Sequence, residues 1–252
     1  MNGSRLTLVF ENDWKMADFV AAKWRDISSE AIRSRGLFTV ALSGGKTPKE
    51  VYRRLAGEGG KGILWYKTHV FFVDERFVPN ADADSTYRMI KETLLDSAGV
   101  PLGNIHPIPT DLSDPVSAAG RYERDIALFF GLPEDGIPEF DLVMLGIGTD
   151  GHTASLFPGS PALSERSRLV AAAAPGGKKH DRITLTLPVL NKAKNVIFLV
   201  TGKEKAEVLR DVLQGSDISL PASLVVPEEG GLLYLADADA GSLLKEEGKK
   251  EI

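Results

Sequence analysis

Short apolar segments that alternate with longer amphipathic ones are the feature that most restricts the fold of this chain. An apolar run of about four to eight residues is typical of a buried strand, and apolar side chains three or four residues apart are typical of a helix. We expect strands at 6–10, 38–42, 70–73, 141–145, 183–187, 196–200 and 233–236, and helices at 14–34, 48–56, 85–96, 115–130 and 204–214. This alternation predicts an α/β fold of Rossmann-like type, with a doubly wound, mainly parallel sheet and helices on both faces.

Size and composition favour one globular domain. The chain has 252 residues, of which 43% are hydrophobic and 26% charged, so it holds enough apolar sequence for a sizeable core. The sequence contains no internal repeat, and no linker is long enough to mark a domain boundary. We therefore expect a single domain over residues 1–252.

Charge and cysteine content restrict the partners and the chemistry. The formal net charge is −5, whereas proteins that bind nucleic acid or anionic membranes usually carry a basic excess, so neither partner is expected. Cysteine is absent, which excludes disulfides, thiolate nucleophiles and cysteine-ligated metals. The amino terminus lacks a secretion signal and no apolar stretch approaches the roughly 20 residues of a membrane span, so a cytoplasmic location is expected. The sequence leaves the oligomeric state open.

A glycine-containing turn follows the second predicted strand. Gly44 and Gly45 let the backbone approach an anion, and the N-terminus of the following helix attracts negative charge. Thr47 is expected to cap this helix, in capping-box spacing with Glu50. Together with Ser43, the turn is a candidate phosphate site, and a plain tight turn is the alternative.

Three ionisable residues, Asp74, Glu75 and Arg76, come directly after the third predicted strand. In open α/β sheets, ligands bind beyond the carboxyl ends of the strands, so this position favours a functional role. The alternative is an exposed ion pair, which is frequent and contributes little to stability.

The segment 145–159 is rich in glycine and contains a candidate general base, His152. We expect a short helix to begin near Thr153, whose positive end would favour a neutral imidazole that can accept a proton. Asp150 lies two residues earlier and could orient the ring. The alternative is a histidine that only caps the helix or bonds a loop carbonyl.

Two further cations flank predicted strands. Arg182 precedes the strand at 183–187, and Lys205 follows the strand at 196–200. An arginine can hold a phosphate through two hydrogen bonds and a lysine can add a point charge, although solvated side chains are the alternative. The remaining histidines, His69, His106 and His180, are expected to be structural or exposed.

Taken in order, five motifs resemble the 6-phosphogluconolactonase family over nearly the whole chain. They are Leu-Ser-Gly-Gly-Lys-Thr-Pro at 42–48, Val-Asp-Glu-Arg at 73–76, Asp-Gly-His-Thr-Ala-Ser-Leu-Phe-Pro at 150–158, Arg-Ile-Thr-Leu-Thr at 182–186 and Thr-Gly-Lys-Glu-Lys-Ala at 201–206. The resemblance implies a sheet similar to that of glucosamine-6-phosphate deaminases. Two positions depart from the family pattern: Thr86 replaces an expected asparagine, and Gly241 an expected alanine.

The resemblance implies hydrolysis of 6-phosphoglucono-δ-lactone to 6-phosphogluconate, without metal or cofactor. The residues it implies for phosphate binding are Ser43, Gly44, Gly45, Thr47, Arg182 and Lys205. The candidate catalytic residues are His152, Asp150, Arg76 and Asp74. His152 would take a proton from water, and Arg76 or backbone N–H groups near Gly44 and Gly45 would stabilise the oxyanion.

Two other functions remain as alternatives. In a sugar-phosphate isomerase or deaminase of the same architecture, Asp74 would move a proton on an open-chain sugar. The residues after His152 and the cation at Arg76 favour the lactonase. A non-catalytic sugar-phosphate sensor would keep the phosphate site without a base, which the Asp150 and His152 pair argues against.

Overall fold

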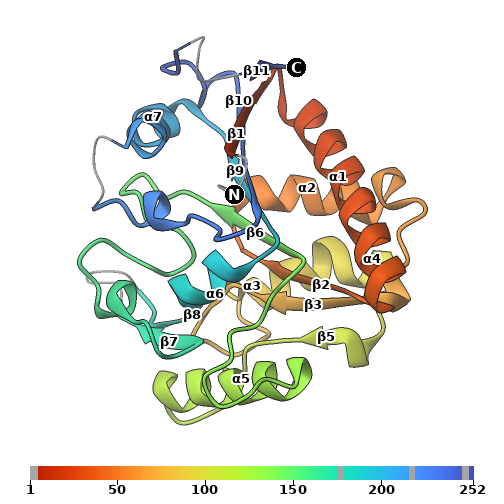
Figure 1. Ribbon diagram of the computed structural model, residues 1–252, viewed down its shortest axis with the longest axis vertical. Coiled ribbons are helices and arrows are strands. Elements are labelled where there is room, and N and C mark those ends of the chain that lie inside the picture. Colours follow the sequence, from red (N-terminus) through yellow and green to blue (C-terminus); the bar gives the residue numbers. More distant parts are fainter. Residues whose placement is uncertain (1–4, 175–178, 216–218, 246–249) are drawn as a thin grey trace.

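The computed structural model describes residues 5–174, 179–215, 219–245 and 250–252. Within these residues, one eight-stranded sheet has the order β11-β1-β10-β9-β6-β2-β3-β5, and all of its neighbouring strands are parallel (Figure 1). Its strands are β1 (Arg5–Phe10), β2 (Phe38–Leu42), β3 (Thr68–Phe72), β5 (Ile105–His106), β6 (Leu142–Gly146), β9 (Asn195–Val200), β10 (Gly231–Asp237) and β11 (Lys250–Glu251).

The helices follow the predicted segments closely. They are α1 (Asp13–Arg35), α2 (Lys46–Ala56), α3 (Thr86–Ile90), α4 (Asp96–Ala98), α5 (Pro115–Phe130), α6 (Leu187–Lys192) and α7 (Ala206–Gln214). The helix expected at 85–96 is interrupted, because a π-helical segment, Lys91–Leu95, separates α3 from α4. The sequence analysis did not predict α6, which begins with Leu187 and Pro188.

The strand predicted at 183–187 belongs to a different sheet. It forms β8 (Arg182–Leu185), which pairs antiparallel with β4 (Asp74–Arg76) and with β7 (Val170–Ala173). Polar Arg182 and Thr184 alternate with apolar residues, a pattern that is typical of antiparallel strands. The strand ends at Leu185, and α6 begins two residues later with a proline in its first turn. The expectation that this strand extends to residue 187 within the parallel sheet was therefore wrong.

The chain winds the sheet in two directions, as predicted. From β2 it moves to β3 and β5, whereas from β6 it moves through β9 to β10 on the other side. Right-handed crossovers therefore place α1 and α2 on one face and α6 and α7 on the opposite face (Figure 1). The direction changes between β2 and β6, where the loops after adjacent strands diverge and leave a crevice for a ligand.

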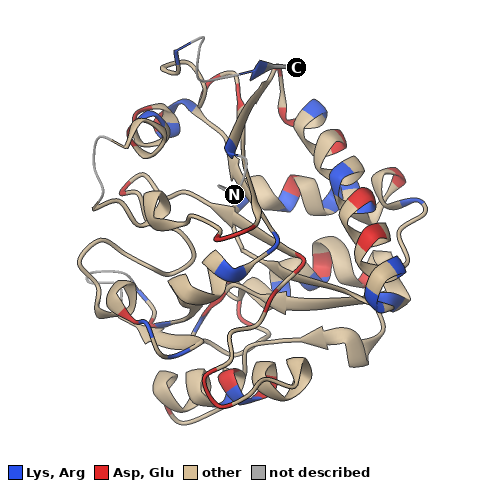
Figure 2. Ribbon diagram, in the orientation of Figure 1, with Lys and Arg blue, Asp and Glu red and all other residues tan. Residues whose placement is uncertain are grey.

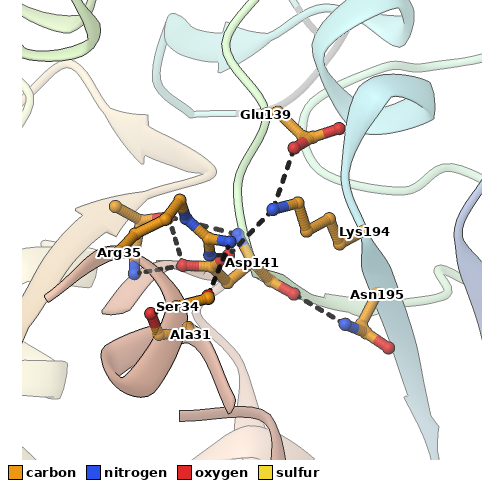
Figure 3. Close-up of polar contacts among 8 residues, drawn as sticks. Ala31, Ser34, Arg35, Glu139, Asp141, Lys194 and Asn195 are labelled. Atoms are coloured by element: carbon orange, nitrogen blue, oxygen red, sulfur yellow. Dashed lines mark hydrogen bonds and ion pairs between the residues drawn. The ribbon is translucent and has the colours of Figure 1, made fainter. Parts of the chain in front are cut away.

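A buried carboxylate joins three elements at the amino end of the sheet. Asp141, just before β6, accepts hydrogen bonds from the backbone N–H and Oγ1 of Thr39 at 2.9 and 3.1 Å. It is also ion-paired with Arg35 at the end of α1, and Lys194 approaches it from the other side at 3.8 Å (Figure 3). Asp141 therefore anchors the edge of the sheet opposite the carboxyl ends of the strands.

Basic and acidic residues are mixed along the helices that flank the sheet. Figure 2 shows basic and acidic residues interspersed along α1, α2 and α5. None of the helices among the described residues has the length and apolarity that crossing a membrane requires.

Candidate active site

A cavity of about 560 Å³ opens at the carboxyl edge of the parallel sheet, where the direction of winding changes. Its walls come from the segments after β2, β3, β6 and β9. It brings together every predicted site residue except Asp150: Ser43, Gly44, Gly45, Thr47, Asp74, Arg76, His152, Arg182 and Lys205. Asp13, Glu50, Glu204 and Asp237 also line the cavity.

The glycine turn after β2 begins α2 in a way the sequence analysis did not foresee. Gly45 is the N-cap, and its φ of 124° lies in a region that favours glycine. Thr47 is the second helical residue, and its Oγ1 lies 2.5 Å from Oγ1 of Thr201. The predicted Thr47 cap was therefore wrong, because the helix begins at Lys46, two residues before the expected start at Pro48. Among the described side chains none caps α2, so its first N–H groups face the cavity edge without such a partner.

Two arginines lie opposite each other in the small antiparallel sheet. Arg76 of β4 pairs with Arg182 of β8 in the ladder register, and both line the cavity. Burial, followed by the charge of Arg76, lowers the pKa of Arg182. The Nε atom of Arg182 is buried and has no hydrogen-bond partner among the described residues. A partly buried cation beside another cation is costly unless an anion binds there, so this pair is suited to a negatively charged ligand.

Glu75 faces away from the cavity and has a structural role. It is 1% exposed and accepts hydrogen bonds from the backbone N–H groups of Arg76, Thr86 and Tyr87, each at 2.7 Å, and from Ser85 Oγ at 3.0 Å. Burial raises its pKa, and these donors oppose the rise. Its oxygens hold the start of α3 against β4, so Glu75 is not placed to activate a water in the cavity.

The segment after β6 is a folded loop, and the helix predicted near Thr153 does not form. Gly151 and Ala154 have φ angles of 78° and 52°, which a continuous α-helix does not contain. The hydroxyl of Thr153 donates to the carbonyl of Gly146 at 2.9 Å and closes the loop on itself. The helix-dipole argument for a neutral His152 therefore fails.

Local hydrogen bonding orients His152 instead. Its Nδ1 is hydrogen-bonded to Oδ1 of Asp150, and its backbone N–H donates to the same oxygen at 3.2 Å. A carboxylate can only accept, so Nδ1 carries the proton and Nε2 carries the lone pair. The ring lies 4.7 Å from that of Phe157, and the His152 side chain is 25% exposed. This arrangement is suited to removing a proton from water.

Ser155 joins the loop after β6 to the small sheet. Its hydroxyl donates to Oδ2 of Asp74 at 2.6 Å, and its N–H donates to Thr184 Oγ1 at 3.2 Å. The sequence analysis did not single out Ser155, although it lies in the same motif as His152. The segments after β3 and β6 are thus held in fixed relative positions.

The segments of this site match a known family. A family model described as glucosamine-6-phosphate isomerases/6-phosphogluconolactonase matches residues 11–234. The chain belongs to this family. A 6-phosphogluconolactonase of Synechocystis sp. is 42% identical over 219 residues, which cover 86% of this chain and 89% of that protein.

Solved structures give the same result. The 6-phosphogluconolactonase from Trypanosoma cruzi has a TM-score of 0.86 and 32% identity, and the match covers 97% of this chain and 98% of that one. A monomeric glucosamine-6-phosphate deaminase shares the fold with a TM-score of 0.78 at 20% identity, over 94% of this chain and 100% of the other. Both the resemblance found in the sequence and the predicted α/β architecture are confirmed.

The two departures from the family pattern lie in different places. Thr86 lines the cavity, and its Oγ1 lies 3.0 Å from the position of a Cβ atom added at Gly44, so this departure falls within the site. Gly241 does not line the cavity; a Cβ atom there would lie 2.9 Å from both γ-carbons of Val9. Only the first departure can affect ligand contacts directly.

Proposed function

We propose that this chain hydrolyses 6-phosphogluconolactone to 6-phosphogluconate, in the oxidative pentose phosphate pathway, with His152 as the general base. The relatives described above carry the name of this activity and support it. The observation that supports the base is the hydrogen bond between Asp150 and Nδ1 of His152, at the wall of a cavity lined by two arginines. The predicted cytoplasmic location remains a prediction.

In the first step, Nε2 of His152 takes a proton from water while the water oxygen bonds to C1 of the lactone. The C1 carbonyl oxygen becomes an oxyanion, and Asp150 stabilises the imidazolium that forms. Arg76 and the N–H groups of Gly44 and Gly45 line the same cavity, and either can donate to the oxyanion.

In the second step, the oxyanion collapses and the bond between C1 and the ring oxygen breaks. The imidazolium of His152 returns its proton to that ring oxygen, which becomes the C5 hydroxyl of the product. The carboxylic acid then releases a proton to solvent. His152 is neutral again and ready for a second turnover.

The phosphate of the substrate is assigned to the cationic wall of the cavity. Arg182 supplies two hydrogen-bond donors in a plane, and Lys205 supplies a point charge. The uncapped N-terminus of α2, with the turn from Ser43 to Thr47, adds backbone donors and the positive end of the helix dipole. Binding the distant phosphate orients C1 toward His152, so binding energy contributes to catalysis.

The direct test is hydrolysis of freshly generated lactone, corrected for spontaneous ring opening. We expect acid release that depends on enzyme concentration and falls by about 10²- to 10⁴-fold with His152→Ala. Glucosamine 6-phosphate serves as the competing substrate, with ammonia release as the readout. Release of ammonia without lactone hydrolysis would assign the chain to the deaminase branch of the family.

We also expect the hydrolysis to be independent of metal. The described residues contain no group of three or more histidine and acidic side chains that could hold a metal ion. The proposed steps use only His152, Asp150 and cationic donors. Full activity should therefore survive exhaustive treatment with a chelator. Activity that disappears with chelator and returns with zinc would contradict the mechanism.

A further inference from the structure

Asp74 has an arrangement that the proposed hydrolysis does not explain. Side chains two residues apart in a strand share one face, so Asp74 and Arg76 point the same way from β4 and Glu75 points the other way. Asp74 and Arg76 both line the cavity, whereas Glu75 does not. The strand therefore presents one carboxylate and one cation to the ligand.

The two oxygens of Asp74 differ in their partners. Oδ2 accepts the hydroxyl of Ser155 at 2.6 Å, whereas Oδ1 has no hydrogen-bond donor among the described residues. Oδ1 is not among the fully buried side-chain atoms that lack a partner, so it is open to the cavity that Asp74 lines. Because Ser155 already occupies Oδ2, Oδ1 is the oxygen that can accept a donor from a ligand or from water in the cavity.

We infer that Oδ1 of Asp74 accepts a hydrogen bond from a ring hydroxyl of the sugar lactone and so selects a hydroxylated substrate. This inference rests on the proposed function, which it deepens by assigning a specificity residue. Ser155 fixes the rotation of the carboxylate, so Oδ1 is oriented before the substrate binds. A substrate hydroxyl donates a hydrogen bond to this oxygen, whereas a lactone without that hydroxyl loses this bond.

The surroundings of Asp74 favour a neutral donor over a cation. Arg76 lies on the same face of β4, and Arg182 lies in the neighbouring strand opposite Arg76. These two charges repel a ligand ammonium group and attract an anionic one. A phosphorylated polyhydroxy lactone meets both requirements, because its phosphate is anionic and its ring hydroxyls are neutral donors.

The test measures the activity of each protein variant on each of four lactones. Wild-type protein and Asp74→Ala are assayed on 6-phosphogluconolactone and on its 2-deoxy, 3-deoxy and 4-deoxy analogues. We expect Asp74→Ala to lower kcat/KM for the full lactone by about 10- to 100-fold, the range of a hydrogen bond to a charged group. For the one analogue that lacks the recognised hydroxyl, the same substitution should change kcat/KM by less than about 3-fold. This analogue cannot form the hydrogen bond to Asp74 in the wild-type protein either.

Three controls accompany this comparison. Ser155→Ala removes the donor to Oδ2 but keeps the acceptor, so its loss should be smaller than that of Asp74→Ala. Asp74→Asn keeps a weaker, uncharged acceptor and should fall between wild type and Asp74→Ala. Asp26→Ala removes an exposed carboxylate on α1 far from the cavity and should leave all four activities unchanged. Thermal unfolding of each variant reports folding separately.

Each other outcome contradicts the inference. An equal loss on all four lactones, with a lowered unfolding temperature, would make Asp74 a structural residue. A loss of kcat of about 10²- to 10⁴-fold on every lactone, with a changed pH profile, would make it the general base. A wild-type protein that hydrolyses none of the lactones would contradict the proposed function itself, and the assignment of Asp74 would fall with it.

Discussion

The imidazole of His152 lies where a glycine leaves room for it. A Cβ atom added at Gly148 would overlap Nδ1 of the ring and would lie 2.5 Å from Oδ1 of Asp150. The hydrogen bond between the two side chains therefore depends on the absence of a side chain two residues before Asp150. A glycine-rich sequence is usually typical of a flexible loop. Here Gly148 instead leaves the space in which Asp150 and His152 form their hydrogen bond.

The first prediction concerns the proposed base. Replacing His152 with alanine should lower kcat by about 10²- to 10⁴-fold, the range of one positioned general base, while substrate binding is largely retained. Asp150→Asn should cost less, because it disturbs the orientation of the ring without removing it. Steady-state kinetics on fresh lactone measure both effects. A near-normal kcat for His152→Ala would move the role of the base to Asp74, since Glu75 faces away from the cavity.

The second prediction concerns the phosphate. Arg182→Ala and Lys205→Ala should each raise KM by about 10- to 100-fold, with a smaller loss of kcat, because each removes a hydrogen bond to a charged group. Lys203→Ala is the matched control, since Lys203 is exposed and does not line the cavity. An unchanged KM in both cavity variants would exclude these two residues from the phosphate site.

At the scale of elements, the two ends of the sheet are specialised differently. The carboxyl ends of the strands carry the cavity, and the amino ends carry Asp141, whose side chain is only 3% exposed. Asp141 joins the end of α1 to β2 and β6, and its carbonyl accepts from Asn195 of β9 at 2.9 Å. Asp74 and Asp141 both lie next to strands in the sequence. Asp74 follows its strand and lines the cavity, whereas Asp141 precedes its strand and belongs to the scaffold.

The third prediction tests this separation. Asp141→Ala should lower the free energy of unfolding by about 3 kcal/mol, because it leaves the N–H and hydroxyl of Thr39 and the charge of Arg35 without their partner. Urea unfolding measures the change. Glu139→Ala breaks only the exposed pair with Lys194 and should change stability by less than about 0.5 kcal/mol (Figure 3). Because Asp141 is far from the cavity edge, a large fall in kcat per folded molecule would contradict the scaffold role.

Elements with strong periodicity could be predicted from the sequence, and elements held by tertiary contacts could not. Apolar runs located six strands of the parallel sheet correctly, and the seventh run, at 183–187, formed a strand of the small antiparallel sheet instead. The short strands β4 and β7 were missed because β4 consists of three ionisable residues and β7 of a valine and three alanines. The helix expected at Thr153 and the cap expected at Thr47 were wrong, because contacts with Gly146 and Thr201 decide both conformations. The motifs identified nine residues that line the cavity, but Ser155 was not singled out.

At the scale of the whole molecule, two histidines connect stability to pH. His69 Nδ1 and His106 Nε2 lie 3.1 Å apart at the edge of the sheet, and His106 stacks on Phe71 with ring centroids 4.2 Å apart. Burial, then the charge of His69, lowers the pKa of His106 to about 4, and burial lowers the pKa of His69. Both rings are therefore structural and are neutral when the chain is folded near neutral pH.

The fourth prediction follows from this pair. Between about pH 6.5 and about pH 4, the unfolded chain binds protons at these histidines that the folded chain does not, so stability falls as pH decreases through this window. Urea unfolding at about pH 7.5 and at about pH 5 measures the loss. His106→Phe keeps the stacking and removes one titrating group, so the difference between the two pH values should shrink. An unchanged difference would show that other groups cause the acid sensitivity.

Side chains alternate between the two faces of β4, which pairs with β8. The charge that β4 presents to the cavity therefore depends on the number of residues between β3 and β4. One residue inserted between Val73 and Asp74 that shifts the register of β4 against β8 by one residue would turn every side chain of β4 to the opposite face. Glu75 would then face the cavity, and Asp74 and Arg76 would face the start of α3. The anion-binding wall could thus be lost while every functional residue survived in the sequence. A length change at this position that shifts the register is therefore expected to change the ligand even when both arginines are kept.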